Sequence, residues 1–340
     1  MKKLVIVVVI IVSTAIRALA QYSTELIKAA NSGNPIAQSN LAYCYLVGDG
    51  VAQDLSQAAI WYQKAANQGL APAQYMLGQR YYRGEGVPQD LAKAVYWYQK
   101  AADQNQMDAL RNLGQCYENG EGVQQDYRKA VNYYQRAYDA GSEIGAFCLG
   151  KCYYNGFGVT KDFAQAASWY QKAADRGFVL AQIYLGECYE KGEGVTQDYT
   201  QAMKWYRKVA DQNSGVAIVA QYYIGRFYFE GKGVTKDYES AYSWFYKAYS
   251  KGYVPAIANI GEMYYNGHYV SKDYVKAFEL LKKAAEAPES PSGDAMNMLS
   301  TCFRFGIGVT KDLKKAEYWL NKAQEAGSDK AKSIIQLLGE

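Results

Sequence analysis

The chain of 340 residues contains a single histidine, His268, and only six prolines. One histidine excludes a metal site built from several histidines, and we expect neither a metal ion nor a cofactor. A hydrolase triad would have to use His268, yet the S-x-x-K and G-x-S-x-G signatures of serine nucleophiles do not occur. The scarcity of proline favours long regular elements over a loop-rich fold. We therefore expect no catalytic residues in a chain made largely of regular secondary structure.

The N-terminal segment has the layout of a secretory signal peptide. Two lysines precede the apolar run Leu4–Val12, and a more polar stretch ends at Ala20. These features predict a signal peptide at residues 1–20, cleaved between Ala20 and Gln21. The alternative is an uncleaved anchor, but Arg17 interrupts the run before the roughly 20 apolar residues that span a membrane. We expect export to the bacterial periplasm or the extracellular space through the general pathway, with no stable membrane insertion after cleavage.

The charge of the chain gives little support for nucleic-acid binding. The sequence has 37 basic and 33 acidic residues, a formal net charge of +4. Three of the basic residues lie in the predicted signal peptide, so the mature chain carries a charge of about +1. No long block of lysine and arginine remains to neutralise a phosphate backbone. We therefore expect no nucleic-acid partner.

A pattern of about 36 residues recurs along almost the whole chain. One glycine recurs at positions 48, 84, 120, 156, 192, 231, 267 and 306, and one aspartate at positions 54, 90, 126, 162, 198, 237, 273 and 312. Two three-residue insertions, near 214–215 and within 288–293, account for the departures from strict spacing. Such a period is typical of a repeat solenoid with incomplete end units. The sequence predicts a capping half-repeat at 21–36, eight repeats at 37–330 and a capping helix at 331–340.

Each repeat has the pattern of two helices. In the first repeat, Ala37, Leu41 and Tyr45 are four residues apart and share one helix face. The recurring glycine then ends this helix, because glycine adopts a left-handed backbone without steric cost. The recurring aspartate suits the N-cap of the second helix, in which Ala58 and Trp61 begin another core stripe. No repeat can bury these stripes alone, so neighbouring repeats must stack into an all-α solenoid.

The repeated string A-x-x-x-L-G-x-x-Y-x-x-G-x-G-V-x-x-D-x-x-x-A-x-x-W-Y-x-K-A-A-x-x-G resembles the Sel-1-like repeat (SLR) family, relatives of the tetratricopeptide repeats, over about residues 37–327. The resemblance implies a right-handed α/α superhelical solenoid of about eight helix pairs, whose first helices line a concave face. It implies a non-enzymatic scaffold or adaptor that binds a protein or peptide partner in envelope or host-interaction processes. A cysteine-rich branch of the family is linked to β-lactams. The alternative is therefore a β-lactam- or peptidoglycan-acting hydrolase.

Five of the six cysteines share one slot, directly before the framework aromatic residue of the first helix: Cys44, Cys116, Cys152, Cys188 and Cys302. Equivalent atoms in stacked repeats lie roughly 10 Å apart, beyond the reach of a disulfide. Only Cys148 and Cys152, one helical turn apart, are candidates for a disulfide, and buried free thiols are the alternative. The cysteine-rich relatives pair cysteines between the two helices of a repeat. No predicted second helix here carries a cysteine, which weakens the hydrolase alternative.

The concave face is the remaining place for function. Tetratricopeptide relatives contact ligands through first-helix positions two before and two, five and six after the framework leucine. Transferred by register, the candidate partner-binding residues are Tyr43, Tyr75, Gln79, Tyr82, Arg83, Arg111, Gln115, Phe147, Lys151, Tyr154, Tyr222, Arg226 and Phe229. Rings supply contact area, arginine pairs with carboxylates and amides match backbone groups, so this set suits an extended peptide. The alternative is an ordinary polar helix face.

One repeat departs from the G-x-G-V pattern. It reads Gly267-His268-Tyr269-Val270, with Tyr269 in place of the second glycine. We expect this loop to differ in shape, because tyrosine avoids the backbone conformations that only glycine adopts freely. His268 has no visible nucleophile partner and is interpreted as an exposed loop residue. Both sequence drift and a functional role are open as causes of the variation.

Overall fold

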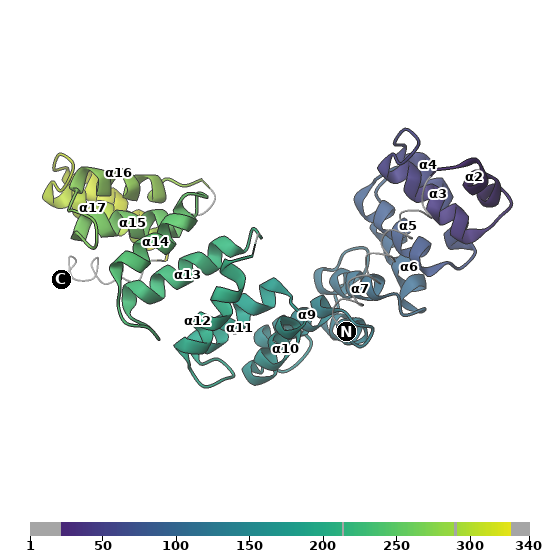
Figure 1. Ribbon diagram of the computed structural model, residues 1–340, viewed down its shortest axis with the longest axis horizontal. Coiled ribbons are helices and arrows are strands. Elements are labelled where there is room, and N and C mark those ends of the chain that lie inside the picture. The colour runs from purple at the N-terminus through teal and green to yellow at the C-terminus, as the bar shows by residue number, and fades with distance from the viewer. Residues whose placement is uncertain (1–21, 213, 289–290, 328–340) are drawn as a thin grey trace, which may run out of the picture. The chain divides into compact units, whose positions relative to one another are not determined.

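The computed structural model describes residues 22–212, 214–288 and 291–327. Over these residues the chain forms 17 helices and no strands (Figure 1). The chain divides into two compact units, Met1–Phe178 and Val179–Glu340, which are called unit 1 and unit 2 below. The predicted signal peptide, its cleavage site at Ala20 and Gln21, and the predicted capping helix at 331–340 lie outside the described residues.

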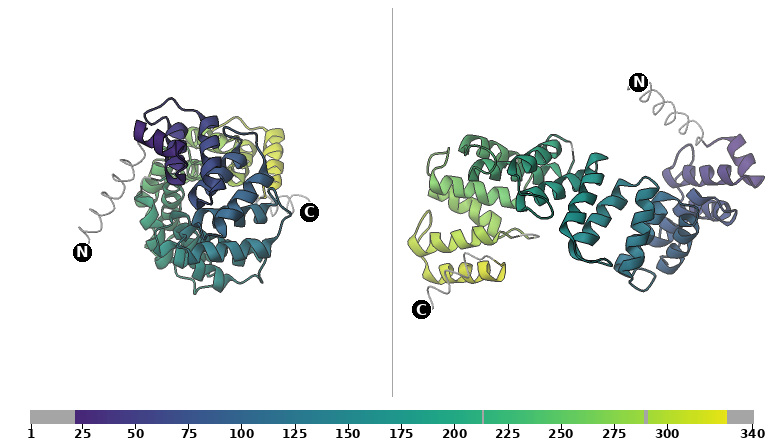
Figure 2. Two further views of the ribbon diagram at one scale, coloured as in Figure 1. Left: turned by 90° about the vertical axis from the view of Figure 1, so that its right-hand side faces the viewer. Right: turned by 90° about the horizontal axis from the view of Figure 1, so that it is seen from below.

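Consecutive helices pack against one another within each unit (Figure 2). The helices of unit 1 are α2 (Thr24–Asn31), α3 (Pro35–Val47), α4 (Leu55–Asn67), α5 (Ala71–Arg83), α6 (Leu91–Ala102), α7 (Met107–Asn119), α8 (Tyr127–Asp139), α9 (Glu143–Asn155) and α10 (Phe163–Asp175). Those of unit 2 are α11 (Val179–Lys191), α12 (Tyr199–Ala210), α13 (Ala217–Glu230), α14 (Tyr238–Tyr249), α15 (Val254–Asn266), α16 (Tyr274–Ala285), α17 (Gly293–Phe305) and α18 (Leu313–Glu325). No helix in this described part combines the length and apolar composition of a membrane span.

The helices begin and end as the sequence predicts. Gly156 follows α9 with a φ of 78°, a left-handed backbone that glycine adopts without steric cost. Asp162 precedes α10, and its carboxylate accepts hydrogen bonds from the amides of Ala164 and Gln165 at 2.9 and 3.0 Å. The recurring aspartate caps a second helix in every repeat. The predicted solenoid of helix pairs is therefore confirmed within each unit.

Aromatic rings of the second helices fill the space beside glycines of the first helices. Tyr170 on α10 is 1% exposed and lies against Gly150 on α9. A Cβ atom at Gly150 would come within 2.5 Å of this ring, far closer than van der Waals contact. Tyr98, Tyr134 and Tyr206 are buried in the same way in other repeats. Much of the tyrosine content is therefore structural framework, as the repeat pattern predicts.

The prediction of a differently shaped loop at Tyr269 is wrong. Tyr269 has a φ of 65°, in the left-handed range that the second glycine occupies in the other repeats. The amide of His268 donates to the carbonyl of Met263 at 3.0 Å, and equivalent bonds close the loops elsewhere. These backbone hydrogen bonds hold the loop in its usual shape, at a conformational cost of order 1 kcal/mol for the tyrosine.

Candidate functional site

The first helix of each repeat positions the side chains that the sequence assigns to partner binding. The first helices are α3, α5, α7 and α9 in unit 1 and α11, α13, α15 and α17 in unit 2. Residues three or four apart share a helix face, so the selected positions of one helix lie beside those of the next first helix in the stack. Two hollows lie among these positions, one in each unit.

The N-terminal groove is the hollow of unit 1, with a volume of about 180 Å³ between α5 and α7. Its lining consists of Gln79, Tyr82, Arg83, Tyr98, Arg111, Asn112, Gln115, Cys116 and Glu121. Five of these belong to the predicted partner-binding set, namely Gln79, Tyr82, Arg83, Arg111 and Gln115. Sequence register therefore brings together side chains from two different repeats.

Two guanidinium groups dominate the charge of the N-terminal groove. Arg83 and Arg111 share the lining with one carboxylate, Glu121. That carboxylate accepts a hydrogen bond from the Tyr82 hydroxyl at 2.7 Å. The hydrogen bond to Glu121, together with burial, raises the pKa of Tyr82 to about 12. Carboxylates outside the lining lie 3.8 Å from Arg83 and 3.7 Å from Arg111 and offset part of the charge.

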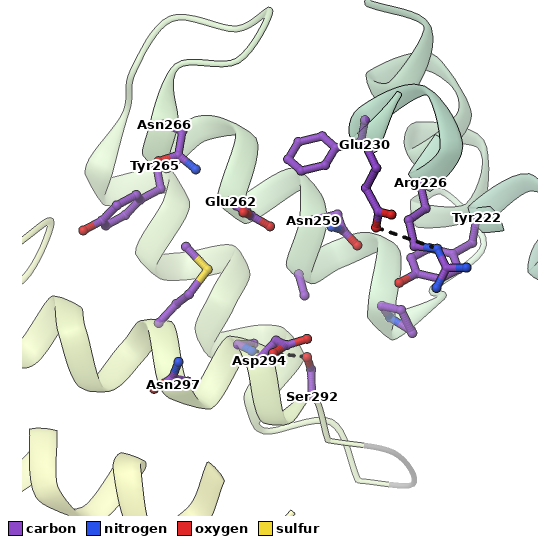
Figure 3. Close-up of a pocket in the computed structure, with 15 residues that line it drawn as sticks. Tyr222, Arg226, Glu230, Asn259, Glu262, Tyr265, Asn266, Ser292, Asp294 and Asn297 are labelled. Carbon is purple, nitrogen blue, oxygen red and sulfur yellow. Dashed lines mark hydrogen bonds and ion pairs between the residues drawn. The ribbon is translucent and has the colours of Figure 1, made fainter. Parts of the chain in front are cut away.

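The C-terminal groove is the hollow of unit 2, with a volume of about 490 Å³ among α13, α15 and α17 (Figure 3). Its lining consists of Tyr222, Arg226, Phe229, Glu230, Pro255, Ala258, Asn259, Glu262, Tyr265, Asn266, Ser292, Asp294, Ala295, Asn297 and Met298. Tyr222, Arg226 and Phe229 belong to the predicted set. Three successive first helices contribute to this groove, which makes it the larger of the two candidate sites.

Arg226 is tied into the wall of the C-terminal groove by two carboxylates. Its guanidinium group forms a hydrogen-bonded ion pair with Glu190 and lies 4.0 Å from Glu230. Burial disfavours the charged guanidinium, but these carboxylates outweigh burial, so the pKa of Arg226 lies above its ordinary value. The charge of Arg226 is therefore compensated within the fold. Burial also raises the pKa of the neighbouring Tyr222 to about 12.

Polar side chains from α15 and α17 face the same groove. Figure 3 shows Asn259 and Glu262 on one side and Asp294 and Asn297 on another. Asp294 lies in the first turn of α17, where the helix dipole favours a carboxylate. Asn297 is 8% exposed, and its Oδ1 has no hydrogen-bond partner among the described residues. An amide oxygen that is buried without a hydrogen-bond partner is uncommon in folded proteins.

Five predicted residues lie in neither groove lining: Tyr43, Tyr75, Phe147, Lys151 and Tyr154. Phe147 is only 8% exposed and packs on Tyr170 and Phe178, so it belongs to the core of unit 1. Lys151 lies 3.8 Å from Glu118 in an ion pair. Tyr43 is 45% exposed, whereas Tyr75 and Tyr154 are half-buried against other rings. Register identifies a helix face but not how deeply each side chain is buried.

The sequence reasoning missed several residues of the C-terminal groove. Glu262, Tyr265 and Asn297 occupy the same first-helix positions that selected the named candidates, so the register contained the signal for them. Asn259 and Asp294 lie at other positions. They reach the groove because three first helices surround it, which a rule applied to one helix at a time does not capture.

All six cysteines have pKa values above the ordinary value for a thiol. All six are free thiols in the structure, including Cys148 and Cys152, the pair considered for a disulfide. Burial raises the pKa of Cys116, Cys152 and Cys188 to about 12 and that of Cys302 to about 11. Because the thiolate is the reactive form, burial keeps these thiols in their less reactive protonated form at neutral pH.

The interpretation of His268 as an exposed loop residue is wrong, because the structure places its side chain half-buried. The ring stacks on Tyr238 with 4.1 Å between centroids and 6° between planes. Phe157 stacks on Tyr127 at the equivalent place in unit 1, with centroids 4.8 Å apart. Burial and two nearby lysines lower the pKa of His268. The neutral ring of His268 therefore occupies the position that the ring of Phe157 occupies in unit 1.

Comparisons with known proteins agree on the repeat. The Sel1 repeat family matches residues 35–70, 71–106, 108–142, 145–178, 179–214, 218–253, 254–288 and 293–328. A protective antigen present in uropathogenic Escherichia coli strains, whose crystal structure displays an SLR fold, is 36% identical with a TM-score of 0.80; the match covers 92% of this chain and 66% of that one. A Sel1 repeat protein from Oxalobacter formigenes is 28% identical with a TM-score of 0.67, over 92% of this chain and 89% of that one. None of the curated proteins matches this chain.

Proposed function

Because the chain belongs to the Sel1 repeat family, we propose that it is an exported scaffold that binds an extended segment of a partner protein in its first-helix grooves. The observation that carries the proposal is that first-helix positions of successive repeats line a hollow in each unit. An extended segment exposes backbone amides and carbonyls at regular intervals. The glutamine, asparagine and arginine side chains of the grooves match these groups, and the aromatic rings supply contact area.

The exported location is the second part of the proposal. The basic start, apolar run and Ala20 ending support a cleaved signal peptide. The similar Escherichia coli protein is a protective antigen, which fits a protein accessible to the host. The periplasm or the extracellular space is therefore the compartment in which we place the partner, and an adaptor in envelope or host-interaction processes is the role.

The test of this proposal is partner capture in the native host. Full-length protein and the variant Tyr82→Ala, Arg83→Ala, Arg111→Ala are crosslinked in cells, and the captured proteins are identified by mass spectrometry. We expect the triple variant to lose at least about tenfold of the partner signal, because clustered aromatic and arginine side chains carry most binding energy. Circular dichroism should show unchanged helicity.

The matched control replaces one tyrosine and two basic residues on a second helix. Lys93, Tyr96 and Lys100 lie on α6, are exposed, and are absent from both groove linings. Their alanine variant should retain the partner. Equal retention by both triple variants would rule out the N-terminal groove as the binding site. Nitrocefin turnover by the purified protein would instead support the hydrolase alternative.

A further inference from the structure

We propose that the N-terminal groove binds a carboxylate of the partner's extended segment through the guanidinium groups of Arg83 and Arg111. The carboxylate belongs either to an acidic side chain or to the free C-terminal end of the segment. This inference rests on the proposed function, because it specifies the chemistry of one of the same two grooves. It is argued from the hydrogen bonding, pairing and burial of the two arginines.

The two arginines of the N-terminal groove have open hydrogen-bond donors. Arg83 lies 3.8 Å from Glu85, and Arg111 lies 3.7 Å from Asp108. Both distances exceed the length of a hydrogen bond, and neither guanidinium group donates a hydrogen bond within the described residues. A guanidinium group carries N–H donors in a planar fork that matches the two oxygens of a carboxylate. The groove therefore offers donors for which a carboxylate is the best acceptor.

The carboxylates closest to the two arginines have other roles. Glu85 pairs with Arg80 at 2.7 Å, and the side chain of Arg80 is only 4% exposed. A buried guanidinium group depends strongly on its carboxylate, so Glu85 serves mainly Arg80 rather than Arg83. Asp108 lies in the first turn of α7, where the helix dipole favours a carboxylate without any contribution from Arg111. Neither arginine of the groove therefore has a carboxylate of its own.

The single carboxylate of the lining is held by neutral donors. Glu121 accepts a hydrogen bond from the Tyr82 hydroxyl at 2.7 Å and another from the side-chain amide of Asn119 at 3.1 Å, one on each oxygen. The pKa of Tyr82 is raised to about 12, so its hydroxyl group stays protonated at neutral pH and adds no negative charge. An incoming carboxylate therefore reaches the arginines without displacing Glu121 from its partners.

The depth of the hollow suits one charged group. The side chain of Arg111 is 24% exposed and that of Arg83 is 55% exposed, so one guanidinium group lies in the wall and the other at the rim. Attraction between opposite charges is stronger where water is partly excluded. A volume of about 180 Å³ has room for a carboxylate and a short stem. Gln79 and Gln115 line the same hollow with amide groups that match adjoining peptide backbone.

The framework of the repeat requires neither arginine. Arg83 lies six residues after the framework leucine of its repeat, and Arg111 lies two residues before the framework leucine of the next repeat. No other repeat has arginine at either position. The corresponding pair in the C-terminal groove is Glu230 and Ala258. The two arginines therefore separate this groove from the one that the same repeat pattern forms in unit 2.

The test measures how much full-length protein is retained on immobilised nonapeptide pools with neutral random residues. Two pools attached at the N-terminus differ only in having a free or an amidated C-terminal carboxyl group. Three further pools with both ends blocked carry glutamate, glutamine or lysine at the central position. We expect at least about tenfold more protein on the free-carboxyl pool than on the amidated pool, or on the glutamate pool than on the glutamine pool, with the difference falling as salt is raised. The pair of pools that shows the difference identifies the source of the carboxylate.

The site is located by removing charge while keeping a polar side chain. Arg83→Gln with Arg111→Gln should reduce the preference for carboxylates to less than about threefold, because both guanidinium groups are lost. Arg128→Gln with Arg176→Gln removes the same charges at exposed positions of unit 1 outside the lining and should leave the preference intact. Circular dichroism and thermal unfolding confirm that both double variants fold.

Each other outcome overturns the inference in a distinguishable way. Retention that is equal across the pools, or strongest on the lysine pool, contradicts carboxylate recognition but leaves peptide binding, and with it the proposed function, in place. A preference for carboxylates that survives Arg83→Gln with Arg111→Gln assigns the recognition to another surface. Competition by inorganic phosphate at lower concentration than a glutamate-centred peptide identifies a phosphate group as the ligand instead. No retention on any pool overturns the inference, and the proposed function then stands or fails on partner capture in cells.

Discussion

The two grooves lie among first helices that follow the same repeat pattern in different units. Basic residues outnumber acidic ones in the lining of the N-terminal groove, and the reverse holds for the C-terminal groove. Two arginines and one glutamate line the N-terminal groove, whereas three carboxylates and one arginine line the C-terminal groove. The glycines that end the first helices around both grooves share a left-handed backbone. The framework thus fixes where a groove forms, and the few positions that face the groove decide its charge. One repeat architecture thereby presents two hollows with differently charged linings.

The two units also differ in the burial of one ion pair. In each unit, this pair is formed by a glutamate that lies five residues after the framework leucine. In unit 1, Glu118 accepts a hydrogen bond from Tyr134 and pairs with Lys151, whose side chain is 40% exposed. In unit 2, Glu190 accepts a hydrogen bond from Tyr206 at 3.1 Å and pairs with Arg226, which is only 26% exposed. The arginine version is more deeply buried, so it depends more strongly on its carboxylate.

The largest effect is expected from removing these two glutamates. Glu190→Ala should lower the free energy of unfolding by about 3 kcal/mol, because it leaves a partly buried guanidinium and a buried hydroxyl without their acceptor. Glu118→Ala should cost about 1–2 kcal/mol, since the Lys151 ammonium reaches water. Urea unfolding measures both values, and hydrogen exchange localises the loss to α11–α13 or to α7–α9.

Glutamine variants at the same sites act as controls, because glutamine keeps the acceptor for tyrosine while removing the charge. Glu118→Gln should recover most of the stability lost in Glu118→Ala. Glu190→Gln should recover less, because the charge of Arg226 still lacks its nearest carboxylate. Equal losses for the two alanine variants would show that the burial of the cation does not distinguish the units.

A smaller difference is expected from adding a methyl group at the framework glycine. At Gly150 the new Cβ would lie 2.5 Å from the ring of Tyr170, whereas at Gly261 it would lie 3.1 Å from Leu281. Overpacking costs about 1–3 kcal/mol and the better helix propensity of alanine returns about 1 kcal/mol. Gly150→Ala should therefore destabilise unit 1 by up to about 2 kcal/mol. Gly261→Ala should stay within about 0.5 kcal/mol of wild type, because a leucine shifts more easily than a ring.

Thermal and urea unfolding of both alanine variants provide the measurement. A loss at Gly261→Ala that equals the loss at Gly150→Ala would contradict the view that a leucine in place of the framework tyrosine loosens this contact. The first repeat already has an alanine in place of the framework glycine. This residue, Ala42, follows the framework leucine and is fully buried.

The recurring framework was predictable from the sequence because the same helix-capping residues recur in eight repeats. Each aspartate N-cap and each left-handed glycine depends on local backbone geometry, which short-range sequence determines. The helix pairs follow from these boundaries. The conformation of Tyr269 was not predictable in this way, because the hydrogen bond from His268 to Met263 holds the loop against the preference of the side chain.

The candidate site was predictable only in part, since register gives the direction of a side chain but not its surroundings. Arg111 and Arg226 line the two grooves, and their role in partner binding stays a prediction. Phe147 was selected by the same rule but lies in the core, because Tyr170 and Phe178 enclose its ring. The opposite charges of the two linings emerge only when the side chains of several first helices are brought together.

The smallest effect on stability is expected at the position directly after the glycine that ends the first helix. This position holds Phe157 in one repeat of unit 1 and His268 in one repeat of unit 2. Burial lowers the pKa of His268 from its ordinary value of 6.5, so between pH 6.5 and this lower pKa the unfolded chain binds more protons than the folded one. The stability that His268 contributes is therefore complete above pH 6.5 and is lost as the pH falls through its folded-state pKa.

His268→Phe copies the residue of unit 1 and should remove this dependence. The stability of wild type relative to His268→Phe should fall as the pH decreases from 7.5 to 5, because carboxylates common to both proteins cancel in the difference. Phe157→His provides the reciprocal test, and stacking on Tyr127 should give unit 1 the same loss of stability in acid. Urea unfolding across this pH range measures both. A pH-independent difference would mean that His268 titrates alike in the folded and unfolded chains, and that its stacking on Tyr238 does not favour the neutral ring.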